Sequence, residues 1–227
     1  EMINRRIRVE KIAIKDVKMR TFITEDASRN EIVQHVYDVT YGTVRPGEDT
    51  LVVIDDSIVR GTTLKESIIR MLARLKPKRI IVVSSSPQIR YPDCYGIDMS
   101  KMGDFIAFNA AVELMKERGK EDCLKEMLEK CKELQRNNQL HTENVVKQLY
   151  KGFTDEEISQ KIAQLITPPE VKIPVDVIFQ TVDGLHQACP SNLGDWYFTG
   201  DYPTPGGNKV VNKAFMNYME GKNVRGY

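Results

Sequence analysis

The stretch that decides the fold is Leu-Val-Val-Ile-Asp-Asp-Ser-Ile-Val-Arg-Gly-Thr-Thr, residues 51–63. Four apolar residues lead directly into two carboxylates, and then into a short loop with one cation, one glycine and three hydroxyls. The apolar run predicts a strand buried on both faces, as in a parallel sheet. Open α/β sheets bind their ligands at the carboxyl ends of such strands. The two carboxylates therefore mark a predicted binding site.

The residues of this loop suit a phosphorylated sugar. Asp55 and Asp56 are expected to hold a pair of ribose hydroxyls and a magnesium ion. Residues 57–63 are expected to surround a phosphate with backbone amides, hydroxyl side chains and the start of the next helix. Gly61 suits this role because a Cβ would keep the backbone away from the phosphate.

Ordinary explanations of the same residues stay open. An Asp-Asp pair after a strand is often only the solvated start of a loop. Thr63 and Glu66 have the spacing of a helix capping box. Arg60 need not contact the phosphate, since its side chain is free to face elsewhere.

The pattern along the chain predicts an α/β fold. Strands are expected at residues 7–14, 22–24, 51–54, 79–84 and 175–179, and helices at 63–75, 101–118, 120–136, 154–165, 182–188 and 212–219. The order strand, loop, helix, strand over residues 51–84 is the unit of a parallel doubly wound sheet.

This order predicts three regions. Residues 1–112 are expected to form an α/β core, and residues 113–166 a helical insertion. Residues 167–227 are expected to hold a final strand, a short helix and a mostly irregular tail. Helical spacing places four residues of the insertion toward the core, and a partner interface is the alternative for them: Leu124, Leu128, Cys131 and Leu134.

Composition excludes several classes of protein. The 227 residues carry 33 cations and 32 anions, which leaves none of the basic surface that nonspecific nucleic-acid binding requires. No apolar run reaches the length of a membrane span, and the first residues lack the apolar stretch of a signal peptide. Four widely spaced cysteines suit a reduced compartment. We expect a cytoplasmic protein without nucleic-acid or membrane partners.

Residues 51–63 resemble the phosphoribosyl-pyrophosphate (PRPP) signature of type I phosphoribosyltransferases, in the form found in the amidophosphoribosyltransferase family. Four further segments resemble that family in the same order: residues 20–23, 85–92, 95–99 and 198–203. The resemblance covers residues 20–108 well and 175–205 more loosely.

The resemblance implies a glycosyltransferase (pentosyltransferase) of purine biosynthesis. In this family, glutamine-derived ammonia displaces pyrophosphate at ribose C1 of PRPP and forms 5-phosphoribosylamine. Asp55 and Asp56 match the acidic pair that binds the ribose hydroxyls and Mg²⁺. The 5-phosphate loop is matched by Ser57, Ile58, Val59, Arg60, Gly61, Thr62 and Thr63. Purine nucleotides occupy the same loop in the family, and family members form homo-oligomers.

The chain departs from the family in its mobile loop, residues 25–47, which is expected to neutralise pyrophosphate. Arg29 and His35 are the candidate catalytic residues of this loop, and Arg45 is its other cation. His35 falls where the family has a lysine, and an imidazole is mostly neutral near pH 7. A surface or packing role for His35 stays open.

Two family features are not expected here. The Cys-x-x-Cys ligands of the family's iron–sulfur cluster are replaced at residues 194–197, so we predict no cluster and expect the cysteines to be buried small side chains. Residue 1 is Glu rather than the nucleophilic cysteine of a glutaminase domain. The resemblance therefore implies the C-terminal part of a longer protein, with an incomplete phosphoribosyltransferase sheet, inactive as this fragment and self-associating.

Two rival functions stay open. The first is a non-catalytic module that binds PRPP or nucleotides and regulates another activity. The second is a phosphoribosyltransferase with a different nucleophile, against which the segments at residues 20–23 and 95–98 argue.

Overall fold

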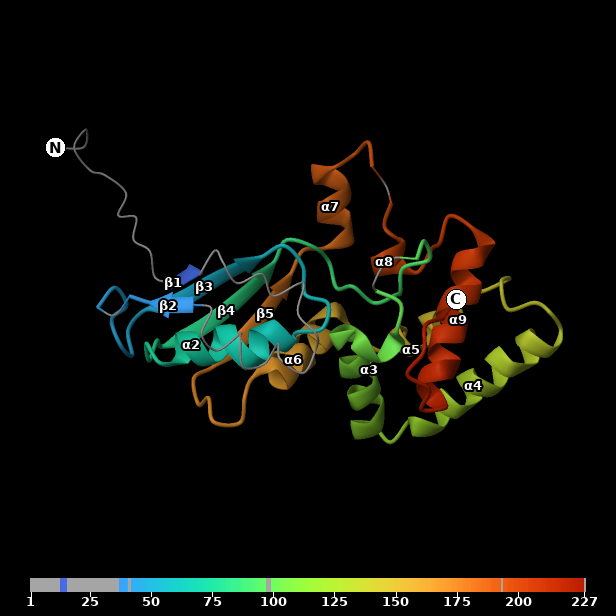
Figure 1. The fold of residues 1–227 in the computed structure, drawn as a ribbon, viewed down its shortest axis with the longest axis horizontal. Helices are drawn as coiled ribbons and strands as arrows, with labels where there is room; N and C mark the ends of the chain where they lie inside the picture. The colour runs from blue at the N-terminus through green and yellow to red at the C-terminus, as the bar shows by residue number, and fades with distance from the viewer. Residues whose placement is uncertain (1–12, 16–36, 41, 97–98, 193, 227) are drawn as a thin grey trace. The chain divides into compact units, whose positions relative to one another are not determined.

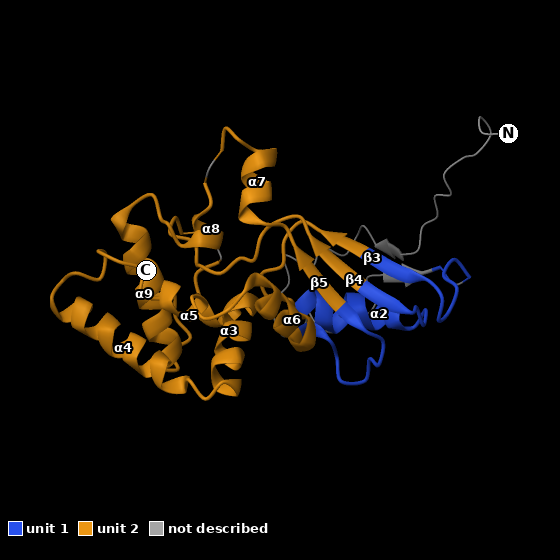
Figure 2. Cartoon of the chain, turned by 180° about the vertical axis from the view of Figure 1, so that it is seen from behind, with its two compact units in different colours: residues 1–52, 62–80, 166–175 blue, residues 53–61, 81–165, 176–227 orange. Residues whose placement is uncertain are grey.

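The structure is a computed structural model that describes residues 13–15, 37–40, 42–96, 99–192 and 194–226. The chain divides into two compact units (Figure 2). Unit 1 comprises residues 1–52, 62–80 and 166–175, and unit 2 comprises residues 53–61, 81–165 and 176–227. The division into three regions at residues 113 and 167 stays a prediction.

The central feature is a sheet of three strands in the order β3 (Thr50–Asp55), β4 (Arg79–Ser84) and β5 (Val175–Phe179) (Figure 1). Backbone hydrogen bonds at both ends of each strand pair show that the strands are parallel. These bonds are Lys78 N–H to Asp49 O (2.8 Å), Ser85 N–H to Asp55 O (2.9 Å), Ile80 N–H to Pro174 O (2.9 Å) and Gln180 N–H to Ser84 O (3.1 Å). The α/β class and the parallel sheet are confirmed.

The prediction that the first of these strands is buried on both faces is wrong. Leu51 is 8% exposed, whereas Val52 is 59% and Ile54 is 74% exposed. Ile178 on β5 is 52% exposed as well. Side chains of a strand alternate between the two faces of the sheet. Among the described residues, β3 is therefore buried along one face only.

A separate two-stranded sheet precedes β3. β1 (Ala13–Lys15) pairs antiparallel with β2 (Tyr37–Val39), and Ala13 lies opposite Val39. The strand predicted at residues 7–14 overlaps β1 at its last two positions. The strand predicted at residues 22–24 lies outside the described residues, and β2 is absent from the sequence-based prediction.

The helix after β3 belongs to unit 1. A π-helical turn, Leu64–Ile68, continues into α2 (Ile69–Ala73). Ile69 and Leu72 are buried, whereas Ile68 is half-buried. The Thr63 side chain makes no capping hydrogen bond, so the capping-box explanation of Thr63 and Glu66 is wrong.

Unit 2 is mainly helical. Its elements are the 3₁₀ turn Met102–Asp104, α3 (Ile106–Glu117), α4 (Glu121–Arg136), α5 (Lys147–Tyr150), α6 (Asp155–Ile166), α7 (Val182–Ala188), α8 (Trp196–Thr199) and α9 (Pro205–Met219). The elements within residues 113–166 are helices joined by turns, and a helical insertion at these bounds stays a prediction. The helix predicted at residues 154–165 begins with a capping box, in which Glu157 accepts from the Thr154 N–H at 2.8 Å and donates its own N–H to Thr154 Oγ1 at 3.2 Å.

The core of unit 2 lies among α3, α4 and α9. The rings of Phe108 and Phe215 are fully buried and meet edge to face with centroids 6.3 Å apart. α4 contributes Leu124, Met127 and Cys131 to this core, whereas the predicted Leu128 and Leu134 are only half-buried. Among the described residues, no helix has the length and apolar content that a membrane span requires.

The tail is more helical than expected. α9 begins at Pro205, seven positions before the predicted start at Asn212. Proline suits the first turn of a helix because that position needs no backbone N–H. The chain before α9 remains largely irregular apart from the short α8.

Candidate functional site

Asp55 and Asp56 lie where β3 ends. Asp55 is the last residue of the strand, and its carbonyl accepts from the Ser85 N–H at 2.9 Å. The Asp56 carbonyl accepts from the Ser86 N–H at 3.1 Å. Pairing with the segment after β4 therefore continues past the strand end and fixes the backbone that carries both carboxylates.

The two carboxylates have no cationic partner among the described residues. Asp55 Oδ1 accepts from the Asp56 N–H at 3.0 Å, and Asp56 Oδ1 accepts from the Ser57 N–H at 2.8 Å. Partial burial is the main cause that raises the pKa of Asp55, and the side chain and charge of Asp56 raise it further, whereas the backbone N–H of Asp56 lowers it. A bound cation would relieve this cost, and carboxylate oxygens are the ligands that Mg²⁺ prefers.

The middle of the loop is anchored to unit 2. Ile58 is 2% exposed, and the Val59 carbonyl accepts from the Ile106 N–H at 2.8 Å. Ile106 is the first residue of α3. The loop carbonyl thereby satisfies one of the free N–H groups at the start of that helix.

Arg60 turns away from the loop toward Asp104. Its Nη2 and Nε atoms lie 3.1 Å and 3.3 Å from Asp104 Oδ2, and each side chain is 34% exposed. This pairing gives Arg60 a role in holding the loop. Asp104 is a residue that sequence reasoning misses, because it lies 44 positions away and belongs to no recognisable motif.

The last part of the loop contains its glycine. Gly61 has a φ of +70°, a left-handed conformation that other residues adopt only with strain. Thr62 and Thr63 belong to unit 1, and both are exposed. That residues 55–63 form a binding site stays a prediction. Residues 55–61 all belong to unit 2.

Two segments that resemble the same family lie together in unit 2. The Arg90 N–H donates to the Tyr197 carbonyl at 2.8 Å, and the Tyr202 hydroxyl donates to the Pro92 carbonyl at 2.7 Å. Gly200 fits closely here, since a Cβ on it would lie 2.8 Å from the Tyr91 ring. Residues 85–92 and 198–203, which are far apart in the sequence, therefore pack as one structure.

The candidate catalytic residues Arg29 and His35 lie outside the described residues. Arg45, the other cation of the predicted mobile loop, is described and lies in unit 1. Its guanidinium is 2.7 Å from Asp49 Oδ1 and 3.2 Å from Glu48 Oε2. Carboxylates thus already engage this cation.

The cysteines differ in burial. Cys131 is buried, and burial raises its pKa to about 12. Cys94 and Cys123 are half-buried, and Cys189 is exposed, so the expectation of buried cysteines is correct only for Cys131. In the described part of the chain, no three His, Cys, Asp or Glu residues form a group suited to a metal ion. The absence of an iron–sulfur cluster stays a prediction.

Comparison with known proteins gives matches to amidophosphoribosyltransferases, each over part of the chain. The chain is 42% identical to the amidophosphoribosyltransferase of Pasteurella multocida over 66 residues, which are 29% of this chain and 13% of that protein. It is 37% identical to the enzyme of the same name from Staphylococcus epidermidis over 97 residues, 43% of this chain and 19% of that protein. The match to the Saccharomyces cerevisiae enzyme is 41% over 63 residues, 28% of this chain and 12% of that protein.

These matches confirm the resemblance to amidophosphoribosyltransferases over part of the chain. Each alignment spans less than a fifth of the relative's length. No protein-family model matches the chain.

Proposed function

We propose that this chain is the PRPP-binding part of an amidophosphoribosyltransferase, a glycosyltransferase that forms 5-phosphoribosylamine and pyrophosphate from PRPP and glutamine-derived ammonia. One observation carries the proposal. Asp55 and Asp56 stand side by side at the carboxyl end of a parallel strand without a cationic partner among the described residues. Ligands of parallel sheets bind at this edge. The local similarity to amidophosphoribosyltransferases supports the same substrate.

Each part of the loop has a proposed task. Asp55 and Asp56 bind the ribose 2- and 3-hydroxyls and Mg²⁺, which neutralises the leaving pyrophosphate when it is bound. Backbone amides and hydroxyls of residues 57–63 bind the 5-phosphate. Buried Ile58 and the Arg60–Asp104 pair keep the loop in one conformation, so that less ordering is required when the substrate binds.

A second function is favoured by a different observation. Residues 37–40 and 42–47 are the described part of the predicted mobile loop, and Arg45 is the cation within them. Its side chain is paired with Asp49 and Glu48. A loop with few available cations stabilises departing pyrophosphate poorly. The alternative is therefore a module that binds PRPP or purine nucleotides without turnover and regulates another activity.

Ammonia-dependent release of pyrophosphate by the full-length protein tests the proposal. Asp55→Asn removes one charge of the proposed Mg²⁺ and ribose site, so we expect kcat/KM to fall about a hundredfold or more. Asp183→Asn, which changes an exposed aspartate on α7, is the control and should leave the rate unchanged. Equal rates in the wild type and Asp55→Asn would reject the assigned role. PRPP binding by a wild type that shows no turnover would favour the regulatory module.

A further inference from the structure

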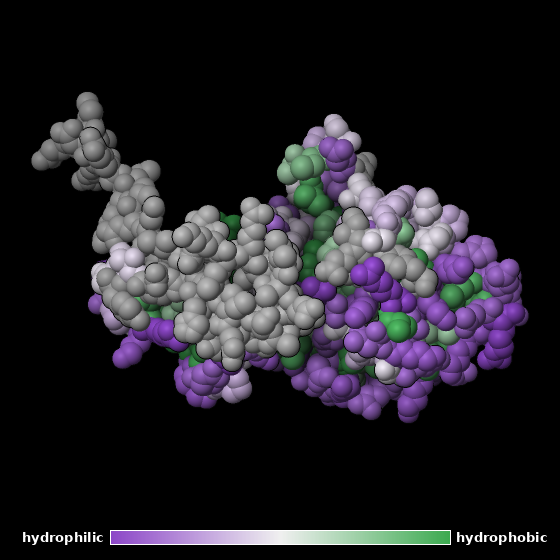
Figure 3. Space-filling model, viewed as in Figure 1, coloured by the Kyte–Doolittle hydropathy of each residue, from purple (hydrophilic) through white to green (hydrophobic). Residues whose placement is uncertain are grey.

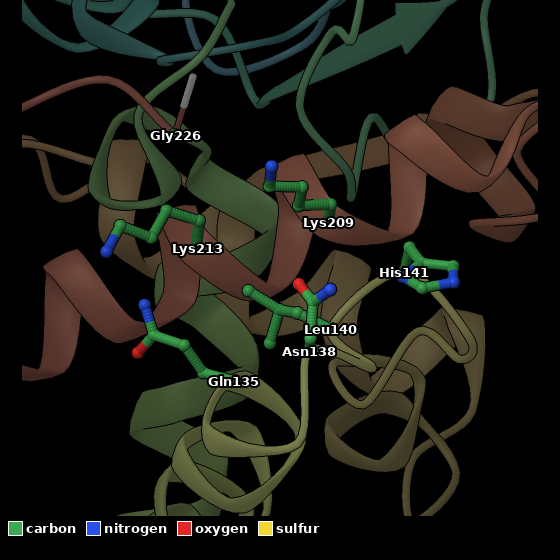
Figure 4. Close-up of a pocket in the computed structure, with 7 residues that line it drawn as sticks. All are labelled: Gln135, Asn138, Leu140, His141, Lys209, Lys213 and Gly226. Atoms are coloured by element: carbon green, nitrogen blue, oxygen red, sulfur yellow. The ribbon is translucent and has the colours of Figure 1, made fainter.

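A cavity of about 440 Å³ lies in unit 2, between α9 and the segment that ends α4. Figure 4 shows Lys209 and Lys213 projecting from α9, with the residues of the other segment facing them. The lining residues are Gln135, Asn138, Leu140, His141, Lys209, Lys213 and Gly226. The volume of the cavity falls in the range of small-molecule sites, which is roughly 300–1,000 Å³.

A buried amide holds one wall of this cavity in place. Asn212 lies on α9 between the two lysines and is 0% exposed. Its Nδ2 donates to the carbonyls of Leu140 and Glu143 at 2.9 Å and 2.7 Å, and its Oδ1 accepts from the Val145 N–H at 3.0 Å. The turn that carries Leu140 and His141 is therefore fixed to the helix that carries the lysines.

A close approach of the backbone forms another wall. A Cβ on Gly226 would lie 2.6 Å from the Val210 carbonyl and 3.1 Å from the Ala214 Cβ. The carbonyl of the preceding residue, Arg225, accepts from Asn217 Nδ2 at 3.0 Å. Glycine at position 226 thus allows residues 225 and 226 to pack against α9 beside the cavity.

The cavity has a one-sided charge. Two lysines and a histidine line it, and no carboxylate is among the lining residues that the structure describes. Neither Lys209 nor Lys213 forms an ion pair or hydrogen bond with a described residue. Three other lysines of this unit, Lys101, Lys120 and Lys151, are likewise without an ion pair among the described residues. Seven are paired with carboxylates, namely Lys116, Lys125, Lys130, Lys132, Lys147, Lys161 and Lys222.

The unpaired lysines have an environment suited to an anion. They are four positions apart on α9, so they lie one above the other on the same helix face. The part of the surface over α4 is mostly hydrophilic in the view of Figure 3. The Gln135 and Asn138 amides add hydrogen-bond donors, and Leu140 adds an apolar surface.

We propose that this cavity binds a small phosphorylated metabolite. Two ammonium groups on one helix face match the charge of a phosphate dianion, and lysine binds phosphate as a point charge. The Leu140 side of the cavity would contact the less polar part of the ligand. This site shares no residue with the loop proposed to bind PRPP.

The competing explanation is structural. The C-terminal end of a helix carries a partial negative charge that nearby lysines offset. Gln135 belongs to the last turn of α4, so Lys209 and Lys213 are placed to serve that purpose without any ligand. In that case the cavity would show no preference for phosphate.

Site-resolved NMR titration with phenyl phosphate at constant ionic strength distinguishes the two explanations, with phenol as the uncharged control. We expect phenyl phosphate to shift the backbone amide signals of residues 135–141 and 209–213, and phenol to leave them unchanged. Replacing both lysines, Lys209→Gln with Lys213→Gln, should weaken binding at least tenfold, because two charge-assisted contacts are lost. Lys151→Gln changes an exposed lysine outside the cavity and should leave the affinity unchanged.

Three results would overturn the proposal. They are unchanged affinity in the Lys209→Gln, Lys213→Gln variant, equal shifts with phenol, and shifts absent from residues 135–141 and 209–213. Shifts confined to residues 55–63 would reject this cavity while they support the PRPP loop. The two proposals therefore succeed or fail separately.

Discussion

The carboxylate of Asp104 lies 3.1 Å from the guanidinium of Arg60 and ties the loop after β3 to the 3₁₀ turn before α3. The adjacent Val59 carbonyl caps α3 itself at Ile106. A side chain and a backbone carbonyl of the loop thus hold it against other segments of unit 2. The contact with Asp104 gives Arg60 a partner that lies outside the loop.

The Arg60–Asp104 pair is expected to stabilise the fold modestly. Both side chains are 34% exposed, and ion pairs of this kind contribute about 0.5–1 kcal/mol. A double-mutant cycle with Arg60→Ala and Asp104→Ala, measured by urea unfolding, should give a coupling energy of this size. A coupling energy of zero would mean that the pair does not hold the loop.

Asp55 is expected to reduce stability at neutral pH. Its pKa in the folded state is raised above 3.8, chiefly by burial, so the folded state favours the protonated form. The favourable contribution of the protonated group is complete below the unfolded pKa and is lost as pH rises through the folded pKa. Asp55→Asn should therefore stabilise the ligand-free protein, and more so at pH 7 than at pH 4.

Urea unfolding of the wild type and Asp55→Asn at several pH values measures this trend. The difference in unfolding free energy between the two proteins should increase with pH and then level off. A difference that is constant from pH 4 to pH 7 would contradict the raised pKa of Asp55.

Gly61 is expected to be required for its backbone conformation. Its φ of +70° makes Gly61→Ala strained, at a cost of roughly 1–2 kcal/mol. Gly152→Ala is a suitable control, because a Cβ there meets nothing within 4 Å and its φ is not positive. Thermal unfolding should show a lower Tm for Gly61→Ala than for Gly152→Ala. The reverse order would show that the loop does not need a left-handed residue.

Asn212 is expected to be the main polar support of the helical region. Asn212→Ala leaves the Leu140 and Glu143 carbonyls and the Val145 N–H without this partner, at a cost of roughly 3 kcal/mol. Asn208→Ala removes one bond of 3.2 Å to the His141 carbonyl, and should cost about 0.5 kcal/mol. Chemical denaturation measures the loss of unfolding free energy in each variant. Similar losses in the two variants would show that Asn212 supports the fold no more than Asn208 does.

The cysteines should react at different rates with a maleimide. Cys189 is exposed and should be modified first, whereas Cys131 is buried with a pKa of about 12 and should react only on unfolding. Mass spectrometry of peptides after partial labelling identifies the modified residues. Cys189→Ser should remove the fastest phase. Early labelling of Cys131 would show that the contact between α4 and α9 opens readily.

Local patterns predict several elements well. β5 and α7 have the bounds that apolar content and helical spacing predict, and Thr181 caps α7 by accepting from the Gly184 N–H at 3.0 Å. The capping box at the start of α6 is a pattern that the sequence shows equally well. Such features depend on residues three or four positions apart, so the sequence alone contains the information.

Features that depend on distant contacts are harder to predict. Val52 and Ile54 belong to an apolar run, yet both are exposed because burial depends on what packs against each face. The partner of Arg60 is 44 positions away, and the segments 85–92 and 198–203 meet only in the folded chain. For the candidate site, the sequence predicts the carboxylates and the glycine of the loop, but not the groups that support them.

Calorimetric titration of the full-length protein with PRPP in Mg²⁺ tests the central proposal most directly. We predict saturable binding with one PRPP per chain, which requires Mg²⁺ and is lost in Asp55→Asn but retained in Asp183→Asn. Binding of equal affinity in the wild type and Asp55→Asn, or no binding by the wild type, would contradict the proposal that the end of β3 holds the sugar phosphate.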